Sequence, residues 1–234
     1  MDVKGKNIII TGGSLGIGKE TAKLLIEKGA NVLITGRSIE RLKKTDFKNV
    51  KMLEFDIGDT ESIENNAKKC LEIFNNRVDV LVNNAGKGVR SSLEDLNIDN
   101  FLKVFNVNVF GLSLFTKEIV PSMKRNRFGT IINIGSTASL KGYKSGSIYS
   151  SSKFAVRCLS QCWQAELRPY NIRVMQVNPS EVTTAFGSKE RIERSEISNK
   201  LSPREIAHAI VSSILMDDRG FVNELNIWAT NPFN

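Results

Sequence analysis

Short runs of β-branched and large apolar residues recur along the chain, and a segment of helical length with one apolar face separates most of them. Seven such runs predict strands at Asn7–Ile10, Asn31–Thr35, Val50–Phe55, Val78–Val82, Thr130–Ile134, Ile172–Val177 and Val222–Ile227. Because these runs are nearly continuous in apolar residues rather than alternating, both faces of the sheet are expected to be covered. The pattern therefore predicts an α/β fold with a doubly wound, parallel, seven-stranded sheet and helices on both faces, which is a Rossmann-like architecture.

The segments between the strands supply the helices. They are predicted at Gly18–Lys28, Ser62–Asn75, Asn100–Arg125, Tyr149–Leu167 and Pro203–Met216. An α/β unit of 234 residues is usually one domain, so residues 1–234 are expected to form a single domain. Residues 184–201 fit neither a helix nor a strand, and they follow the sixth strand. They predict either a substrate lid or a plain surface connection.

The net charge of +8 is unevenly distributed. Residues 1–51 carry 11 basic and 5 acidic side chains, a difference of +6 that leaves +2 for the remainder. This excess indicates either a solvated helix surface or the attraction of a polyanionic cofactor. Mixed charges and the absence of a reading motif argue against binding of nucleic acid.

Cysteine and histidine usage argues against disulfides and against a bound metal. Cys70, Cys158 and Cys162 form no paired framework, and His208 is the only histidine. Cys158 and Cys162 are expected to be small buried side chains one helical turn apart. No apolar run is long enough to cross a bilayer and no leader segment precedes the first strand, so a soluble cytoplasmic protein is expected.

A glycine-rich turn, Thr11-Gly12-Gly13-Ser14-Leu15-Gly16-Ile17-Gly18, joins the first predicted strand to the first predicted helix. Glycine permits positive φ and close backbone approach, while the N–H groups at the start of a helix attract anions. Any tight connection between a strand and a helix favours glycine as well. The position directly after the first strand favours a site for the diphosphate of a dinucleotide.

Further polar motifs follow the later strands in a fixed order. They are Asn83-Asn84-Ala85-Gly86 after the fourth strand, Asn108 followed by Gly111, Ser136 after the fifth strand, Tyr149-x-x-x-Lys153, and Asn178-Pro179 after the sixth strand. Together with the glycine turn, this ordered set resembles the short-chain dehydrogenase/reductase family over essentially the whole chain. The resemblance implies a nicotinamide-dependent oxidoreductase.

Tyr149 and Lys153 lie on one face of a predicted helix because they are four residues apart. A free phenol has a pKa of about 10, and a nearby ammonium with the charge of oxidised nicotinamide would lower it. The resemblance implies that Tyr149 protonates a carbonyl oxygen, that Ser136 hydrogen-bonds this oxygen, and that Lys153 also holds the nicotinamide ribose. It further implies that Asn108 supports a water in a proton relay to Lys153. Ser136 also fits a plain turn, and Asn106 competes with Asn108.

The second predicted strand ends in Thr35-Gly36-Arg37-Ser38, without a carboxylate to bind a ribose 2′-hydroxyl. Arg37 presents a planar fork of donors that suits a 2′-phosphate, so the expected cofactor is NADP(H), with Ser14 and Ser38 assisting. An exposed surface cation is the alternative for Arg37. Leu15 departs from the family pattern, which often has a basic residue at this place.

The resemblance assigns the other cofactor contacts. They fall on Gly12, Gly16, Ile17, Gly18, Asp56, Ile57, Asn83, Ala85, Gly86, Pro179, Val182 and Thr184, in addition to Tyr149 and Lys153. Asp56 also fits as the cap of the next helix. Ser180 replaces a glycine of the family pattern, which affects the local backbone. Glu181, Phe186 and Tyr143 are candidates for the wall of the substrate pocket.

These observations predict an NADPH-dependent oxidoreductase that reduces a ketone or aldehyde with Tyr149 as the acid. A 3-oxoacyl-thioester reductase is one version of it, and Thr130 weakens this version because a basic residue is frequent there. The alternatives are an NADP-binding regulator without activity and an NAD-linked alcohol dehydrogenase. The resemblance implies a homodimer or homotetramer, in which Phe110, Phe115 and Trp163 would serve either the contact or the core.

Overall fold

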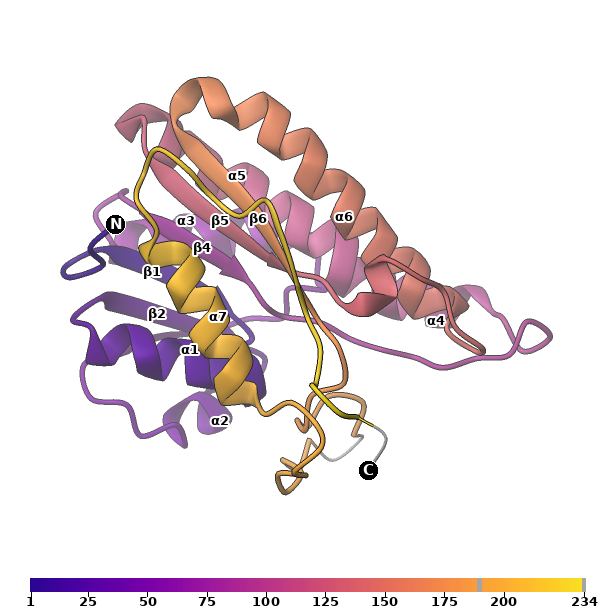
Figure 1. Cartoon of the computed structure of the whole chain (residues 1–234). Helices are drawn as coiled ribbons and strands as arrows, with labels where there is room; N and C mark the ends of the chain where they lie inside the picture. Colours follow the sequence, from indigo (N-terminus) through magenta and orange to yellow (C-terminus); the bar gives the residue numbers. More distant parts are fainter. Residues whose placement is uncertain (189–190, 233–234) are drawn as a thin grey trace.

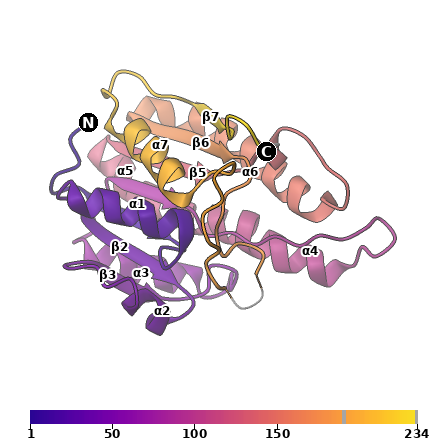
Figure 2. The same cartoon turned by 60° about the horizontal axis from the view of Figure 1, so that its bottom comes forward.

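The computed structural model describes residues 1–188 and 191–232, and it contains one parallel sheet with helices on both faces (Figures 1 and 2). The strands are β1 (Asn7–Thr11), β2 (Asn31–Gly36), β3 (Lys51–Glu54), β4 (Val80–Asn83), β5 (Gly129–Ile134), β6 (Ile172–Pro179) and β7 (Glu224–Ile227). Their order across the sheet is β3-β2-β1-β4-β5-β6-β7, and all pairs are parallel. The expected fold class is confirmed.

The helical elements connect successive strands. They are α1 (Gly16–Glu27), α2 (Ile39–Lys43), α3 (Ile63–Ile73), α4 (Ile98–Phe105), the π-helical turn η1 (Asn106–Gly111), α5 (Leu112–Asn126), the 3₁₀ turns η2 (Thr137–Ser139) and η3 (Arg168–Tyr170), α6 (Ser147–Leu167) and α7 (Pro203–Leu215). Because the strand order reverses between β1 and β4, a crevice opens at their carboxyl ends, where doubly wound sheets bind nucleotides.

Two apolar layers cover the sheet, because alternate residues of a strand point to opposite faces. Ile8 and Ile10 of β1 pack in a cluster with Leu25 of α1 and Ile210 of α7. Ile9 packs on the other face, in a cluster with side chains of α3, α5 and α6. All of these isoleucines are fully buried, and each such burial contributes about 1.5–3 kcal/mol to folding. Strand-end residues are thus held between two close-packed layers.

The helix expected over Asn100–Arg125 is not regular in its middle, so that prediction was wrong there. The chain forms α4, then the π-helical η1, then α5. A Cβ added to Gly111 would lie 1.8 Å from the carbonyl oxygen of Ile57, which shows how closely the two backbones approach. On the same turn, the Asn108 side chain bonds the backbone of Lys87. Such one-turn π-helical insertions occur frequently at functional sites.

Other boundaries differ by a few residues, and one element was missed. Helix α2 was not predicted because it has only five residues, although Ser38 is an N-cap, whose Oγ accepts from the Arg41 N–H at 3.3 Å. Strand β6 extends to Pro179, and β7 begins at Glu224 rather than at Val222. These are shifts of the ends only.

The cysteine prediction was partly wrong. Cys70 is buried in the core, and burial raises the pKa of its thiol to about 12. Cys158 and Cys162 are exposed, because the face of α6 that packs on the sheet carries Val156 and Ser160 instead. Two exposed thiols one turn apart replace the expected buried pair.

In the segment at 184–201, the described residues 184–188 and 191–201 form no helix or strand, and Leu201 makes an isolated bridge to Val182. None of the helices in the described part of the chain combines the length and the apolar character that a bilayer span requires. Within residues 1–188 and 191–232, no three side chains of His, Cys, Asp or Glu are grouped to hold a metal ion.

Candidate active site

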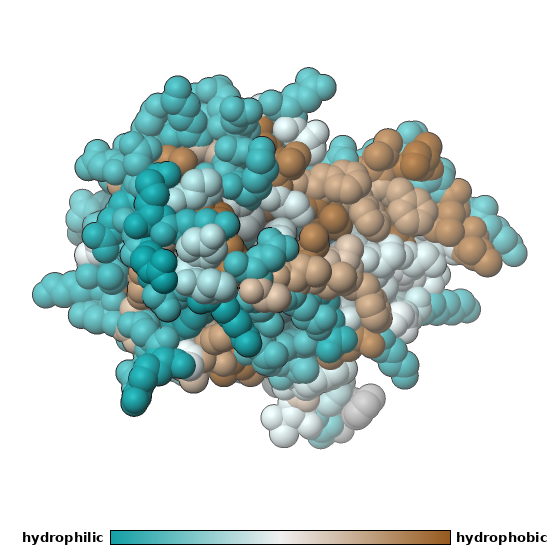
Figure 3. All heavy atoms as spheres, turned by 90° about the horizontal axis from the view of Figure 1, so that it is seen from above, coloured by the Kyte–Doolittle hydropathy of each residue, from teal (hydrophilic) through white to brown (hydrophobic). Residues whose placement is uncertain are grey.

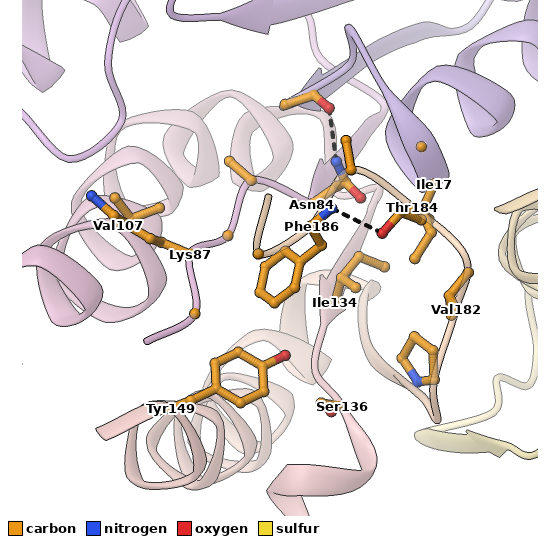
Figure 4. A pocket seen from close by; sticks show the side chains of 18 of the residues that line it. Ile17, Asn84, Lys87, Val107, Ile134, Ser136, Tyr149, Val182, Thr184 and Phe186 are labelled. Carbon is orange, nitrogen blue, oxygen red and sulfur yellow. Dashed lines mark hydrogen bonds between the residues drawn. The ribbon is translucent and has the colours of Figure 1, made fainter. Parts of the chain in front are cut away.

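A cavity of about 1140 Å³ opens at the carboxyl ends of β1, β2, β4, β5 and β6 (Figure 4). Its wall includes nearly all residues that the sequence predicted for the cofactor or for catalysis; the exceptions are Gly18, Asn83 and Asn108. A groove of this size suits a dinucleotide together with a small substrate. Parallel strands bring these residues together, because their carboxyl ends meet at one edge.

The glycine turn forms one end of the cavity. Gly12 has φ of +67°, and a Cβ there would lie 3.0 Å from the Cα of Ala85. Gly16 has φ of +55°, and a Cβ there would lie 3.2 Å from Cγ2 of Thr184. The N-cap residue Leu15 provides no side-chain cap for α1. The start of α1 therefore needs another acceptor for its N–H groups, and an anion meets this need.

Gly18 supports this turn from behind rather than from the cavity wall. A Cβ added to Gly18 would lie 2.4 Å from Nδ2 of Asn84. This amide donates to the carbonyl oxygens of Thr11 at 2.9 Å and Gly12 at 3.0 Å. The glycine at this place thus allows Asn84, which follows β4, to hold the turn that follows β1.

Three guanidinium groups lie in the cavity wall at the end of β2. Arg37 and Arg41 come from the loop and from α2, and Arg191 comes from the segment after β6. Burial lowers the pKa of Arg191, and the charges of Arg37 and Arg41 lower it further. The partner of Arg37 is Asp56, with Nη1 and Oδ2 at 3.9 Å. Close cations, of which one has a carboxylate partner at this distance, favour an added anion.

Tyr149 and Ser136 converge at the other end of the cavity. Tyr149 lies in the first turns of α6, Ser136 follows β5, and the phenol oxygen points toward Ser136 (Figure 4). Burial raises the pKa of Tyr149 to about 12, while the hydrogen bond with Ser136 lowers it. The expected lowering of the Tyr149 pKa is not found, since burial outweighs the hydrogen bond with Ser136. The phenol is thus protonated at neutral pH.

Ser136 is both a turn residue and a hydroxyl at the cavity wall, the two interpretations that the sequence left open. Its Oγ accepts from the N–H of Ala138 at 3.1 Å and so caps η2. Its own N–H is held by Asn178 Oδ1 and Ser139 Oγ, each at 3.2 Å. The turn and its partner on β6 therefore fix the hydroxyl at the cavity wall.

Lys153 is buried below Tyr149, with only 4% of its surface exposed. Its Nζ donates to the carbonyl oxygen of Ile134 at 2.7 Å and lies 5.8 Å from the centre of the Tyr149 ring. Burial lowers the pKa of Lys153 to about 8. The described residues place no carboxylate in an ion pair with this ammonium, so its charge is available to the site.

Asn108 is fully buried behind the wall. Its Oδ1 accepts from the Lys87 N–H at 2.8 Å, and its Nδ2 donates to the Lys87 carbonyl at 2.9 Å and to Ser152 Oγ at 3.0 Å. A Cβ on Gly86 would lie 3.6 Å from Asn108 Oδ1 and 3.8 Å from Lys153 Nζ. Both polar groups therefore approach the same backbone position, which the competing Asn106 does not.

Phe186, from the segment after β6, lies over the end of the cavity that holds Tyr149. Its ring centre is 5.6 Å from that of Tyr149, with the planes tilted by 55° (Figure 4). A Cβ on Gly88 would lie 2.9 Å from the Phe186 ring. Tyr143, Glu181 and Phe186, the three candidates for the pocket wall, all line the cavity.

The sequence profile that describes short chain dehydrogenases matches residues 6–195, which is most of the chain. The chain belongs to the short-chain dehydrogenase family. A curated relative, "Dehydrogenase/reductase SDR family member 7B" of Xenopus laevis, is 31% identical over 227 residues, covering 88% of this chain and 70% of its own length.

Solved structures of this family superpose closely. An alcohol dehydrogenase from the archaeon Thermococcus sibiricus, complexed with 5-hydroxy-NADP, has a TM-score of 0.88 and 31% identity, covering 97% of both chains. A serine dehydrogenase in a closed form, complexed with NADP+, has a TM-score of 0.85 and 26% identity, covering 94% of both chains.

Sequence reasoning missed several residues of this short-chain dehydrogenase site. Asn83 was expected at the cofactor, but its amide is buried and donates to Thr116 and Asn133, and the neighbouring Asn84 lines the cavity. Arg41 was detectable, since it lies one helical turn from Arg37 behind an N-cap serine. Arg191 carries no motif, and only the folded chain brings it to the site.

Proposed function

We propose that this protein is an NADPH-dependent carbonyl reductase in which Tyr149 donates the proton. The observation that carries the proposal is the convergence of the Tyr149 and Ser136 hydroxyls at one end of a dinucleotide-sized groove. Lys153 lies buried beneath them with its charge unpaired by any described carboxylate. These are the groups that transfer of a hydride to a carbonyl requires from the protein.

Tyr149 and Ser136 both act on the substrate oxygen. When bound, NADPH supplies the hydride for the carbonyl carbon. Ser136 Oγ donates a hydrogen bond to the carbonyl oxygen, and Tyr149 Oη gives its proton to the same oxygen as negative charge develops there. Since the two donors are fixed by α6 and η2, their interactions strengthen as the oxygen becomes more basic.

Lys153 lowers the energy of the phenolate that Tyr149 leaves behind. The pKa of about 12 that burial gives Tyr149 favours the protonated acid, and hence reduction, at neutral pH. The Lys153 ammonium stabilises the phenolate after the transfer. Asn108 hydrogen-bonds the backbone of Lys87, and the neighbouring Gly86 lies beside the Lys153 ammonium. Asn108 thereby positions the backbone along which a new proton reaches the Tyr149 phenolate.

The residues present fit NADPH. Gly12 and Gly16 both have positive φ and pack closely on Ala85 and Thr184, and the tight turn that they allow presents the N–H groups at the start of α1 to a diphosphate. Arg37, Arg41 and Arg191 would hold the 2′-phosphate, and Lys153 would hold the nicotinamide ribose. Solved relatives complexed with NADP+ and with 5-hydroxy-NADP support this assignment.

The segment at 184–201 acts as the substrate lid. This assignment is supported by Phe186, whose ring lies against Tyr149, and by Thr184, whose methyl group lies against Gly16. The segment thus touches both the catalytic end and the diphosphate end of the groove. A carbonyl substrate would bind between Phe186 and Tyr143, next to the two hydroxyls.

The proposed acid is tested by Tyr149→Phe, with turnover measured over a panel of ketones, aldehydes and 3-oxoacyl thioesters. This change removes one hydroxyl and keeps the ring that contacts Phe186, so NADPH binding should persist while turnover falls about 10³-fold. Tyr170→Phe is the matched control, since it makes the same change in η3, outside the residues that line the cavity. Undiminished turnover in Tyr149→Phe would refute the proposal. Binding of NADPH without turnover of any substrate would favour the regulator instead.

Cofactor preference is tested with Arg37→Ala and Arg41→Ala. Each should weaken NADPH binding about ten- to a hundredfold and leave NADH binding unchanged, because a hydrogen bond to a charged group contributes about 1.5–3 kcal/mol. Arg90→Ala, at the substrate end of the cavity, is the control. If wild-type protein binds NADH as tightly as NADPH, the assignment of the 2′-phosphate site fails.

Two copies of the chain associate through α4, η1, α5 and α6. Apolar side chains gather on one side of the molecule (Figure 3), and exposed ones on these elements are Ile98, Leu102, Phe110, Leu114 and Phe154. Phe115 is instead fully buried in the core, and Trp163 packs partly against it. An exposed apolar surface of this kind favours contact with a second protein surface.

A further inference from the structure

The diphosphate end of the groove holds a carboxylate of the protein itself. The Gly16 N–H, at the first residue of α1, donates to Glu193 Oε1 at 3.0 Å. The other oxygen of this carboxylate, Oε2, lies 3.9 Å from Lys19 Nζ. Glu193 therefore satisfies the start of α1 with both a hydrogen bond and an ion pair.

The residue after Glu193 is hydrogen-bonded to the same end of the groove. Arg194 donates from Nε to the Thr184 carbonyl at 3.0 Å and from Nη2 to the Val182 carbonyl at 3.3 Å. Thr184 in turn packs against Gly16. Two neighbouring residues of the lid segment thus contact the residues that would surround a cofactor diphosphate.

A carboxylate at this position has the same chemistry as the diphosphate. Both are anions that accept from N–H groups at the start of a helix, where the helix dipole favours negative charge. One N–H group at one helix start does not accommodate both, because their like charges repel at this distance. A diphosphate at the glycine turn would therefore have to displace Glu193.

We propose that Glu193 is an intramolecular competitor of the cofactor diphosphate, which occupies the glycine turn in the cofactor-free protein and leaves it when the dinucleotide binds. This inference rests on the proposed function, since it takes a dinucleotide as the ligand. The competition lowers the apparent affinity for the cofactor, because only those molecules in which the glycine turn is open can bind it. Binding of the cofactor and release of the Glu193 carboxylate from the Gly16 N–H are therefore one coupled event.

The test compares binding affinities rather than turnover. Dissociation constants for NADPH, and for inorganic pyrophosphate as competitor, are measured by quenching of tryptophan fluorescence, with Trp228 in the cavity wall. Glu193→Ala is expected to lower both constants about three- to tenfold, since it raises the open fraction. Glu193→Gln should give a smaller decrease, because the amide oxygen still accepts from Gly16 while the charge is lost.

Glu196→Ala is the matched control, because it removes the same charge three residues along the segment, from an exposed side chain. It should leave both dissociation constants within twofold of wild type. If both alanine variants lower the dissociation constants equally, the cause is the change in net charge, and the inference is overturned. Unchanged dissociation constants in Glu193→Ala would also overturn it. If neither wild type nor Glu193→Ala binds NADPH, NADH or pyrophosphate, the proposed function fails as well. If wild type binds the cofactor and Glu193→Ala binds it equally well, only the proposed competition by Glu193 is refuted.

Discussion

Replacing Lys153 by methionine should make the protein more stable and inactive. Lys153 is 4% exposed, and burial lowers its pKa from 10.5 to about 8. At 1.36 kcal/mol for each pH unit, the charged form costs about 3 kcal/mol of folding free energy. Methionine removes this cost but also removes the hydrogen bond from the charged ammonium to Ile134, which is worth about 1.5–3 kcal/mol. The variant should therefore gain up to about 1.5 kcal/mol at pH 7.

The pH dependence identifies the cause of this gain. Because the pKa of Lys153 is lower in the folded protein than in the unfolded chain, the unfolded chain binds more protons between pH 8 and 10.5. The free energy of unfolding that Lys153 contributes is therefore lowest below pH 8 and rises through that window. Methionine does not titrate, so the advantage of the variant should shrink steadily as the pH increases from 8 to 10.

The measurement is urea unfolding, followed by tryptophan fluorescence at pH 7, 8, 9 and 10. Lys141→Met serves as control because it makes the same change in an exposed side chain at the cavity, and it should change stability by less than about 0.5 kcal/mol at every pH. A gap between wild type and Lys153→Met that does not vary with pH would refute the reasoning. Turnover in Lys153→Met should fall at least about 10²-fold, since the phenolate loses its counter-charge.

Three further substitutions test other parts of the structure. Gly111→Ala should cost more than about 3 kcal/mol in urea unfolding, because its Cβ would lie 1.8 Å from a carbonyl oxygen, whereas Gly220→Ala, with open space around it, should be neutral. Phe110→Asp should convert oligomers to monomers in light scattering, while Met216→Asp, on an exposed residue just beyond α7, should not. Asn108→Ala should cost about 2–3 kcal/mol in thermal unfolding, since both backbone groups of Lys87 lose their partner.

The sequence predicted those parts of the site that depend on local spacing and on strand order. Tyr149 and Lys153 share a helix face because they are four residues apart, and Ser136 meets them because parallel strands end at one edge. Glu193 and Arg191 were not predicted as site residues. Their segment has no periodicity. Glu193 contacts Gly16, 177 positions earlier. Arg191 lies near Arg37 and Arg41, which are also remote in the sequence.

The electrostatic properties of the site could not be predicted from the sequence, for a related reason. The sequence places an ammonium near the Tyr149 phenol, but it does not give the depth of burial, which raises the pKa of Tyr149 instead of lowering it. The irregular helix around Asn108 was not predicted either, because the Asn108 side-chain amide bonds the backbone of Lys87, which lies 21 residues earlier. Propensity within a helix carries no information on such a partner.

The strand order also determines how the sheet meets other chains. Its two edges are β3 and β7, whose side chains are partly exposed and include Lys51, Glu54 and Glu224. The isoleucine-rich β1 lies in the centre and presents no free edge. Charged, short edge strands discourage pairing with strands of another molecule, and so protect against aggregation by sheet extension. The edges of the sheet are therefore poorly suited to pairing with another chain, in contrast to the exposed apolar side chains of α4, η1, α5 and α6.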